Sequence, residues 1–186
     1  MKLLRELSGL REHGKPITVA AGFFDGVHCG HRSVIEYAKD SARKHGGEAW
    51  ILTFDQHPLK VVRPEIAPLM LTSTEHKVAL LETCGVDGCI LLPFTHEFAT
   101  TPATEFAAWL LHCAPTLSEV VVGENWRFGA DAGGTPALLR ELGGEAGLTV
   151  TTLPPVVADG DTISSTRIRM EIMKGNLDHA AAMLGR

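Results

Sequence analysis

The sequence predicts an α/β fold with a doubly wound, mainly parallel sheet of five strands and helices on both faces. Three observations support this prediction. Five short apolar runs between residues 17 and 153 have the length of buried strands. Stretches with the helical spacing of apolar residues separate these runs, which is the alternation typical of a parallel sheet. Because crossovers between parallel strands are right-handed, this order of elements gives a Rossmann-like sheet.

The five expected strands are apolar along nearly their whole length, as strands covered on both faces must be. In chain order they span residues 17–21, 49–54, 88–94, 119–123 and 148–153. Residues 1–13, before the first strand, are expected to form a short helix or an arm. Residues 55–71, after the second strand, contain Pro64 and Pro68, so we expect a loop there. Long loops in compact domains are usually functional or disordered.

Helices are expected between these strands and after the last one. Residues 32–45 carry apolar residues at helical spacing and are followed by two glycines. Thr72 and Glu75 have the spacing of a capping box for a helix over 75–84. Thr101 is expected to cap a helix over 102–113 that begins with a proline. The remaining expected helices span residues 136–145, 165–174 and 177–184.

The composition is that of an ordinary globular protein and favours one domain over residues 1–186. Hydrophobic residues make up 45% of the chain and charged residues 21%, which suffices for a substantial core. The net charge of −5 gives no basic field that would favour nucleic acid. No apolar run approaches the roughly 20 residues that a membrane span needs. Four scattered cysteines without a secretion signal predict a reducing, cytoplasmic location.

A stretch rich in glycine and histidine, residues 22–31, connects the first expected strand to the first expected helix. The start of a helix offers free N–H groups and the positive end of a dipole, which together bind anions. Glycines let a phosphate approach the backbone, and imidazoles can donate hydrogen bonds to it. We therefore predict a phosphate site here. The alternatives are a metal held by His28 and His31, although no Cys-x-x-Cys pair accompanies them, and a merely polar helix start.

Polar residues follow three of the expected strands, at the edge of the sheet where ligands bind in such folds. They are His28 and His31 after the first strand, residues 55–58 after the second and residues 124–129 after the fourth. Because the carboxyl ends of parallel strands lie at one edge, we expect these residues to form one site.

A second polar motif, I-S-S-T-R-I-R over residues 163–169, stands at the start of a later helix. One hydroxyl would be enough to cap that helix, but three hydroxyl residues and two arginines come together here. Hydroxyls, free N–H groups and guanidinium groups suit a polyphosphate. We predict that both motifs meet around one triphosphate, which requires that His31 and Ser165 do not lie on opposite faces of the sheet.

Both motifs resemble those of a known superfamily. G-x-F-D-x-x-H-x-G-H, residues 22–31, is similar to the H-x-G-H signature of the nucleotidyltransferases, and residues 163–169 match their I-S-S-T-x-x-R signature at every fixed position. With further runs in residues 52–58, 71–77, 92–98 and 121–129, the chain resembles the N-terminal half of the bacterial bifunctional FAD synthetases, riboflavin kinase/FMN adenylyltransferase. Phe23 and Trp126 depart from the residues usual in that family.

The resemblance implies a nucleotidyltransferase-type fold and FMN adenylyltransferase activity, in which ATP gives AMP to FMN to form FAD and pyrophosphate. It also implies Mg²⁺ bound mostly by phosphates and water, with no metal ligand assigned among the side chains. The implied catalytic residues are His28, His31, Ser164 and Arg169. The implied ATP-binding residues are Gly22, Phe24, Asp25, Gly26, His28, Gly30, His31, Ser164, Ser165, Thr166, Arg167 and Arg169. The implied flavin-binding residues are Phe54, His57, Pro58, Asn125 and Phe128.

Two other functions stay open at this point. A nucleotidyltransferase for another phosphate acceptor would carry the same two motifs, and a non-catalytic paralogue would bind flavin or nucleotide without turnover. The family normally continues into a riboflavin kinase module, and we expect no such domain within residues 1–186. A riboflavin kinase domain or protein that supplies FMN is therefore an expected partner, whereas nucleic acid and membrane are not.

Overall fold

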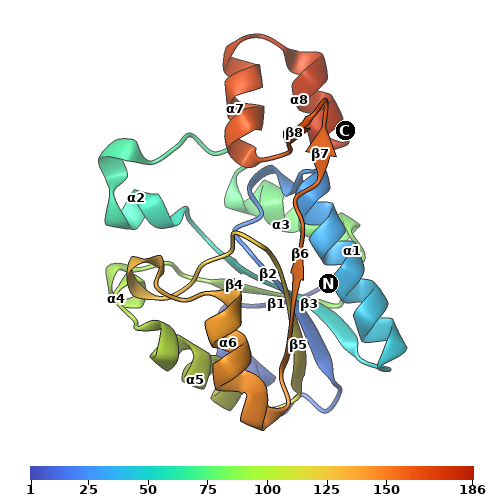
Figure 1. Ribbon diagram of the computed structural model, residues 1–186, viewed down its shortest axis with the longest axis vertical. Helices are drawn as coiled ribbons and strands as arrows, with labels where there is room; N and C mark the ends of the chain where they lie inside the picture. The colour runs from blue at the N-terminus through green and yellow to red at the C-terminus, as the bar shows by residue number, and fades with distance from the viewer.

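A six-stranded parallel sheet forms the centre of the protein (Figure 1). The structure is a computed structural model that describes residues 1–186. The spatial order of the strands is β1-β4-β3-β2-β5-β6, so the direction of winding reverses between β2 and β5. The predicted doubly wound α/β fold is thereby confirmed. The strands are β1 Lys2–Leu4, β2 Ile17–Ala21, β3 Glu48–Phe54, β4 Gly88–Leu92, β5 Leu117–Gly123 and β6 Thr149–Leu153.

The sheet has one strand more than the five expected. β1 pairs in parallel with β4, with Lys2 opposite Gly88, and forms one edge of the sheet. Its three residues are too few to show the period of a strand, and its partner is distant in the chain. The expected helix or arm is therefore wrong for these residues. A 3₁₀ helix, η1 Leu7–Leu10, follows β1.

Helices connect the strands as predicted, with ends that differ by a few residues. α1 begins at Cys29 rather than at residue 32, because His28 caps it. None of the helices combines the length and the apolar character that crossing a bilayer requires. The longer helices are α1 Cys29–Lys44, α3 Thr74–Thr83, α5 Ala103–Cys113, α6 Pro136–Gly143, α7 Ser165–Met173 and α8 Leu177–Leu184.

Two of the expected caps are wrong. The N-cap of α3 is Ser73, whose hydroxyl oxygen accepts the N–H of His76 at 3.2 Å. Thr72 is therefore free to bind elsewhere. In α5 the N-cap position is taken by Pro102, so Thr101 does not cap that helix.

Several short elements were not expected, because they contain too few residues for a periodic pattern. The segment between β3 and α3 was expected to be a loop, but it contains a helix and a 3₁₀ helix. A two-stranded hairpin precedes α7. These elements are α2 Pro58–Val62, η2 Asp25–Val27, η3 Pro64–Ile66, α4 His96–Ala99, η4 Ala130–Ala132, η5 Gly144–Ala146, β7 Val157–Ala158 and β8 Asp161–Thr162.

One layer of helices covers each face of the sheet. The larger apolar core lies between one face and η1, α5 and α6, and Val19 of β2 belongs to it. A second core lies between the other face and α1 and α3, and Ala20 of β2 belongs to that one. Adjacent residues of a strand point to opposite faces. β2 is thus buried on both sides, as its apolar sequence predicts.

The helices α7 and α8 form a separate pair at the carboxyl edge of the sheet, at the top of Figure 1. They enclose a third, small apolar cluster of Ile163, Ile168, Ala180 and Met183. Leu71 and Cys29 from the main body pack against this cluster. The helix pair therefore carries the second motif to the edge where α1 begins.

Candidate active site

Residues 22–31, named the histidine turn, connect β2 to α1 by a tight turn and include the first three residues of α1. Phe24, Gly26 and Val27 have positive φ angles of 58°, 78° and 42°. Glycine adopts such angles freely, whereas Phe24 and Val27 are strained by about 1–3 kcal/mol each. A Cβ at Gly26 would also lie 2.8 Å from Leu71 Cδ1. Such strain persists where the surrounding structure imposes it, and it is concentrated at functional sites.

His28 and His31 form one stacked unit at the start of α1. Nδ1 of His28 accepts a hydrogen bond from the backbone N–H of His31 at 3.3 Å. In the neutral ring the proton is then on Nε2, which can donate it to a ligand. The two rings stack with centroids 3.5 Å apart and 17° between their planes. Phe24 packs edge-on against His31 at 5.2 Å and limits the movement of its ring.

Burial keeps both imidazoles neutral at pH 7. It lowers the pKa of His28 to about 4, and the carboxylate of Asp25 opposes the shift. The pKa of His31 lies well below its usual value, because the ring is buried and because His28 and Lys77 repel its charge. Nδ1 of His31 is buried and has no hydrogen-bond partner in the protein. A ligand that pairs with this nitrogen would relieve the cost of an unsatisfied polar atom.

The buried carboxylate of Asp25 ties three segments together. It accepts the N–H of Leu71 at 3.0 Å and that of Thr72 at 3.1 Å. It also forms an ion pair with Nη2 of Arg169 at 2.6 Å. The Thr72 hydroxyl in turn accepts the N–H of Gly26 at 3.3 Å. These contacts engage both carboxylate oxygens, so Asp25 shapes the histidine turn.

The second motif reaches the histidine turn at the start of α7. Ser164 is the N-cap of α7, and the Ser165 hydroxyl donates a hydrogen bond to the backbone oxygen of Asp25 at 3.0 Å. A Cβ at Gly30 would lie 3.6 Å from the backbone oxygen of Ile163. The two motifs, far apart in the sequence, therefore meet at the carboxyl edge of the sheet.

Both arginines of the second motif are engaged with the protein. Nε of Arg169 donates to the backbone oxygen of Leu69 at 2.6 Å, and its Nη2 pairs with Asp25. Nη1 of Arg167 donates to two backbone oxygens of the β7–β8 hairpin, both at 2.9 Å. Arg167 thus holds the hairpin. Thr166 is exposed on the first turn of α7.

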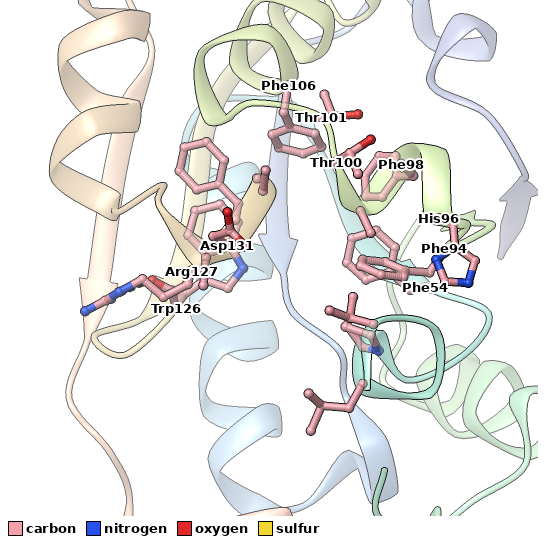
Figure 2. A pocket seen from close by; sticks show the side chains of 18 of the residues that line it. Phe54, Phe94, His96, Phe98, Thr100, Thr101, Phe106, Trp126, Arg127 and Asp131 are labelled. Atoms are coloured by element: carbon pink, nitrogen blue, oxygen red, sulfur yellow. Dashed lines mark hydrogen bonds between the residues drawn. The ribbon is translucent and has the colours of Figure 1, made fainter. Parts of the chain in front are cut away.

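An aromatic cavity of about 770 Å³ opens beside the histidine turn (Figure 2). Gly22, directly after β2, belongs to its lining, so the cavity begins where the turn begins. Figure 2 shows Phe54 and Phe98 on one side of the cavity and Trp126 on the other. Trp126 stacks on Phe128, with centroids 4.9 Å apart and 27° between the rings. The cavity therefore has two opposed aromatic walls.

The structure places three of the five expected flavin-binding residues in the lining of the aromatic cavity and two outside it. Phe54, Pro58 and Phe128 line the aromatic cavity. His57 and Asn125 do not line it. The ring of His57 caps α2 instead, and Asn125 is exposed in the turn after β5.

Three aromatic residues of the cavity were assigned no role from the sequence. Phe94, Phe98 and Phe106 all line the cavity. A signal was available for Phe94, because it follows β4 just as Phe54 ends β3, and these two strands are parallel neighbours. Phe106, on α5, gave no such signal, since an aromatic residue on the buried face of a helix is expected in any core.

The sequence profile of the FAD synthetase family matches residues 10–167. This range includes the histidine turn, the aromatic cavity and the start of the second motif. The chain belongs to the FAD synthetase family. The resemblance to this family, drawn from the two motifs and the further runs between them, is thereby confirmed.

Proteins related to this member of the FAD synthetase family are longer than this chain. The chain is 34% identical over 188 residues to the bifunctional riboflavin kinase/FMN adenylyltransferase of Escherichia coli (strain K12), with 100% of the chain and 59% of that protein covered. A protein of the same name from Listeria monocytogenes is 35% identical over 170 residues, with 90% and 53% covered. The chain thus spans somewhat more than half the length of these relatives.

A solved structure supports the fold of this family member over its whole length. The protein, described as a macrolide-efflux protein from Streptococcus pneumoniae, superposes with a TM-score of 0.85 at 29% identity. The superposition covers 99% of the chain and 61% of that protein.

Proposed function

We propose that this chain transfers the AMP group of ATP to FMN, forming FAD and releasing pyrophosphate. One observation carries the proposal: the cavity that starts at Gly22 brings an aromatic wall next to the histidine turn and the second motif. FMN needs an apolar slot for its ring system and a phosphate site beyond it. The names of the relatives from Escherichia coli and Listeria monocytogenes include FMN adenylyltransferase and support the same activity.

The aromatic cavity suits the flavin of FMN. Its volume of about 770 Å³ lies within the range of small-molecule sites, about 300–1,000 Å³. Phe54 and Trp126 stand on opposite sides of it and can pack on the flat isoalloxazine (Figure 2). Arg63 and Arg127 also line the cavity, and their positive charge would favour the phosphate group of FMN.

The histidine turn would hold the triphosphate of ATP. α1, a helix of 16 residues, presents free N–H groups and the positive end of its dipole there. His28 would donate from Nε2, and the unpaired Nδ1 of His31 would gain a partner. The hydroxyl of Ser164 at the start of α7, whose hydrogen is free, would hold the outer phosphates, whereas the Ser165 hydroxyl already donates to the backbone oxygen of Asp25.

The reaction requires positioning and charge stabilisation rather than a general base. The phosphate of FMN is a competent nucleophile: its oxygen bonds to the α-phosphorus in line, and the bond to pyrophosphate breaks. His28 and His31 would donate hydrogen bonds to the charge that develops on the α-phosphate oxygens. The expected phosphate contact of Arg169 is restricted, because its Nε and Nη2 already bind the protein and leave Nη1 as the free nitrogen.

Mg²⁺ is the metal that we expect with ATP. The structure contains no group of three or more His, Cys, Asp or Glu side chains that could hold a metal ion. Phosphate oxygens and waters would therefore supply most of its ligands, which is usual for Mg²⁺ with nucleotides. Bound there, it would neutralise charge on the triphosphate.

FMN would come from a riboflavin kinase activity, either in the same protein or in a separate one. Both activities occur in the name of the relatives from Escherichia coli and Listeria monocytogenes. We expect the reaction to take place in the cytoplasm, because all four cysteines are free, as is usual in a reducing compartment.

Incubation of the protein with FMN, ATP and Mg²⁺, followed by chromatography, tests this proposal. Formation of FAD supports it. Adenylation of another phosphate acceptor, with FMN left unchanged, would identify a different nucleotidyltransferase. Tight binding of FMN and ATP without any product would identify a non-catalytic paralogue. Either of the last two results contradicts the proposal.

A further inference from the structure

Lys77, on α3, is buried at the junction between the histidine turn and the aromatic cavity, and only 1% of the residue is exposed. Its Nζ donates hydrogen bonds to the backbone oxygens of Phe54 at 2.7 Å and Phe23 at 3.1 Å. A third, at 3.4 Å, goes to the hydroxyl oxygen of Thr53. The same nitrogen lies 4.1 Å from the centroid of the Phe23 ring. All N–H groups of the ammonium therefore have acceptors, and its charge faces an aromatic ring.

The acceptors of Lys77 come from the two halves of the site. Phe23 belongs to the histidine turn, whereas Phe54 ends β3 and lines the aromatic cavity. The hydroxyl of Thr53 also donates to the backbone oxygen of Phe23 at 2.9 Å. One ammonium group thus joins the ends of two adjacent strands. Lysine is rarely buried, because its charge is costly to remove from water, so this arrangement calls for a role beyond filling the core.

We propose that Lys77 is a positioning residue for adenylyl transfer, and that its ammonium group fixes the histidine turn relative to the wall of the aromatic cavity that contains Phe54. This inference rests on the proposed function. Lys77 itself touches neither substrate, since the protein engages all of its N–H groups. It acts through Phe23 and Phe54, whose backbone oxygens it holds.

The expected signature is a loss of kcat with little change in KM. In-line attack depends on the distance between two bound groups, and an error of about 1 Å can lower the rate about 10²-fold. FMN and ATP would still bind, because other residues line their halves of the site. A smaller fraction of folded protein would also lower the measured rate, but it would leave kcat per active site unchanged. Active sites are therefore counted by FMN binding, and kcat is expressed per site.

The charge of Lys77 gives a second signature. A neutral amine has one N–H group fewer than the ammonium and loses its attraction to the ring of Phe23. Burial lowers the pKa of Lys77 to about 8, while the nearby acidic groups Asp25, Cys89 and Asp55 oppose the shift. The value of kcat should therefore decline as the pH rises above about 8.

The other titratable groups that face Lys77 do not explain such a decline. The pKa values of His31 and His57 are lowered, first by burial and in part by the charge of Lys77, so both rings are already neutral above pH 7. Burial raises the pKa of the Cys89 thiol to about 12. A change in kcat between pH 7 and about pH 12 would therefore report the titration of Lys77.

Steady-state kinetics of Lys77→Met test the inference, because methionine keeps the apolar stem and removes every donor. Lys60→Met is the matched control, since Lys60 is exposed on α2 beside the cavity wall. We expect kcat per FMN-binding site to fall about 10²-fold in Lys77→Met, with both KM values within about twofold of wild type. Lys60→Met should behave as wild type. An unchanged kcat in Lys77→Met, or a loss confined to KM, overturns the inference.

If Lys77→Met does not fold, the pH profile of the wild-type protein decides. Its kcat should fall above about pH 8, and Lys77→Arg, whose guanidinium stays charged, should move the fall to higher pH. A kcat that stays constant up to about pH 10 overturns the inference, because the free ammonium has a pKa of about 10.4.

A wild-type protein that forms no FAD at any pH would refute the proposed function instead. The tether itself can then be tested without activity, by ¹³C NMR of the backbone carbonyls of Phe23 and Phe54. Both signals should titrate together near pH 8, because both oxygens bind the same ammonium. Independent titration, or none, overturns the role given to Lys77.

Discussion

Nη2 of Arg169 lies 2.6 Å from a carboxylate oxygen of Asp25, and this ion pair joins residues that are 144 positions apart. Their side chains are only 15% and 2% exposed, so solvent screens the pair weakly. Ser165 donates to the backbone oxygen of Asp25 at 3.0 Å, and Arg186 donates to that of Gly26 at 2.9 Å. These polar contacts help to hold the C-terminal helix pair over the histidine turn.

Asp25→Asn should destabilise the protein by about 3–5 kcal/mol, because it leaves a largely buried guanidinium without its partner. Asparagine keeps the size of the side chain and removes its charge. Urea unfolding measures the change. Asp40→Asn is the matched control, since the ion pair of Asp40 with Arg43 is exposed and should contribute less than about 1 kcal/mol. Equal losses of stability in the two variants would contradict this prediction.

His28→Asn should lower the rate of adenylyl transfer by about 10²–10³-fold, the usual effect of removing one donor aimed at transition-state charge. Asparagine is a good N-cap, so α1 should keep its start. The value of kcat and the thermal unfolding midpoint are measured together, with the exposed His112→Asn as the control. If His28→Asn keeps the wild-type rate, the role of this imidazole is wrong.

Most of the sheet could be predicted because strands buried on both faces are apolar without interruption. The expected residues 17–21 coincide with β2. β1 could not be predicted in this way, since three residues show no period and its pairing with β4 is a long-range contact. The same limit applies to α2 and α4, which have five and four residues.

The two motifs of the candidate site were visible in the sequence, but the partners of their side chains were not. Local spacing was enough to place His28 on the turn before the first helix, although that helix begins at Cys29 rather than at residue 32. The pairing of Arg169 with Asp25, and the contact of Arg167 with the β7–β8 hairpin, depend on how distant segments fold together. Lys77 lies in one of the runs that resemble the family, but the sequence assigned it no role, because a lysine on a helix is expected at the surface.

Folding stability should decline as the pH falls from about 6.5 to about 4. Burial lowers the pKa of His28 from 6.5 to about 4, and the pKa of His31 is lowered as well. In this range the unfolded chain binds protons that the folded protein does not, so acid favours unfolding, and the histidines contribute fully only above about pH 6.5. Urea unfolding at several pH values measures the decline. His28→Asn should show a smaller decline, and an identical one would refute this explanation.

Trp126→Ala should weaken the binding of FMN about tenfold, because the ring faces the cavity and aromatic stacking contributes about 0.5–1.5 kcal/mol beyond the area buried. Trp126→Phe should retain most of the affinity, since it keeps an aromatic surface. Calorimetry with FMN and, separately, with ATP measures both affinities. ATP binding should be unchanged, because the triphosphate site lies at the histidine turn. Trp109→Ala is the matched control, as this tryptophan is partly exposed on α5 outside the cavity lining. An equal loss of FMN affinity in the two variants would mean that the cavity is not where the flavin binds.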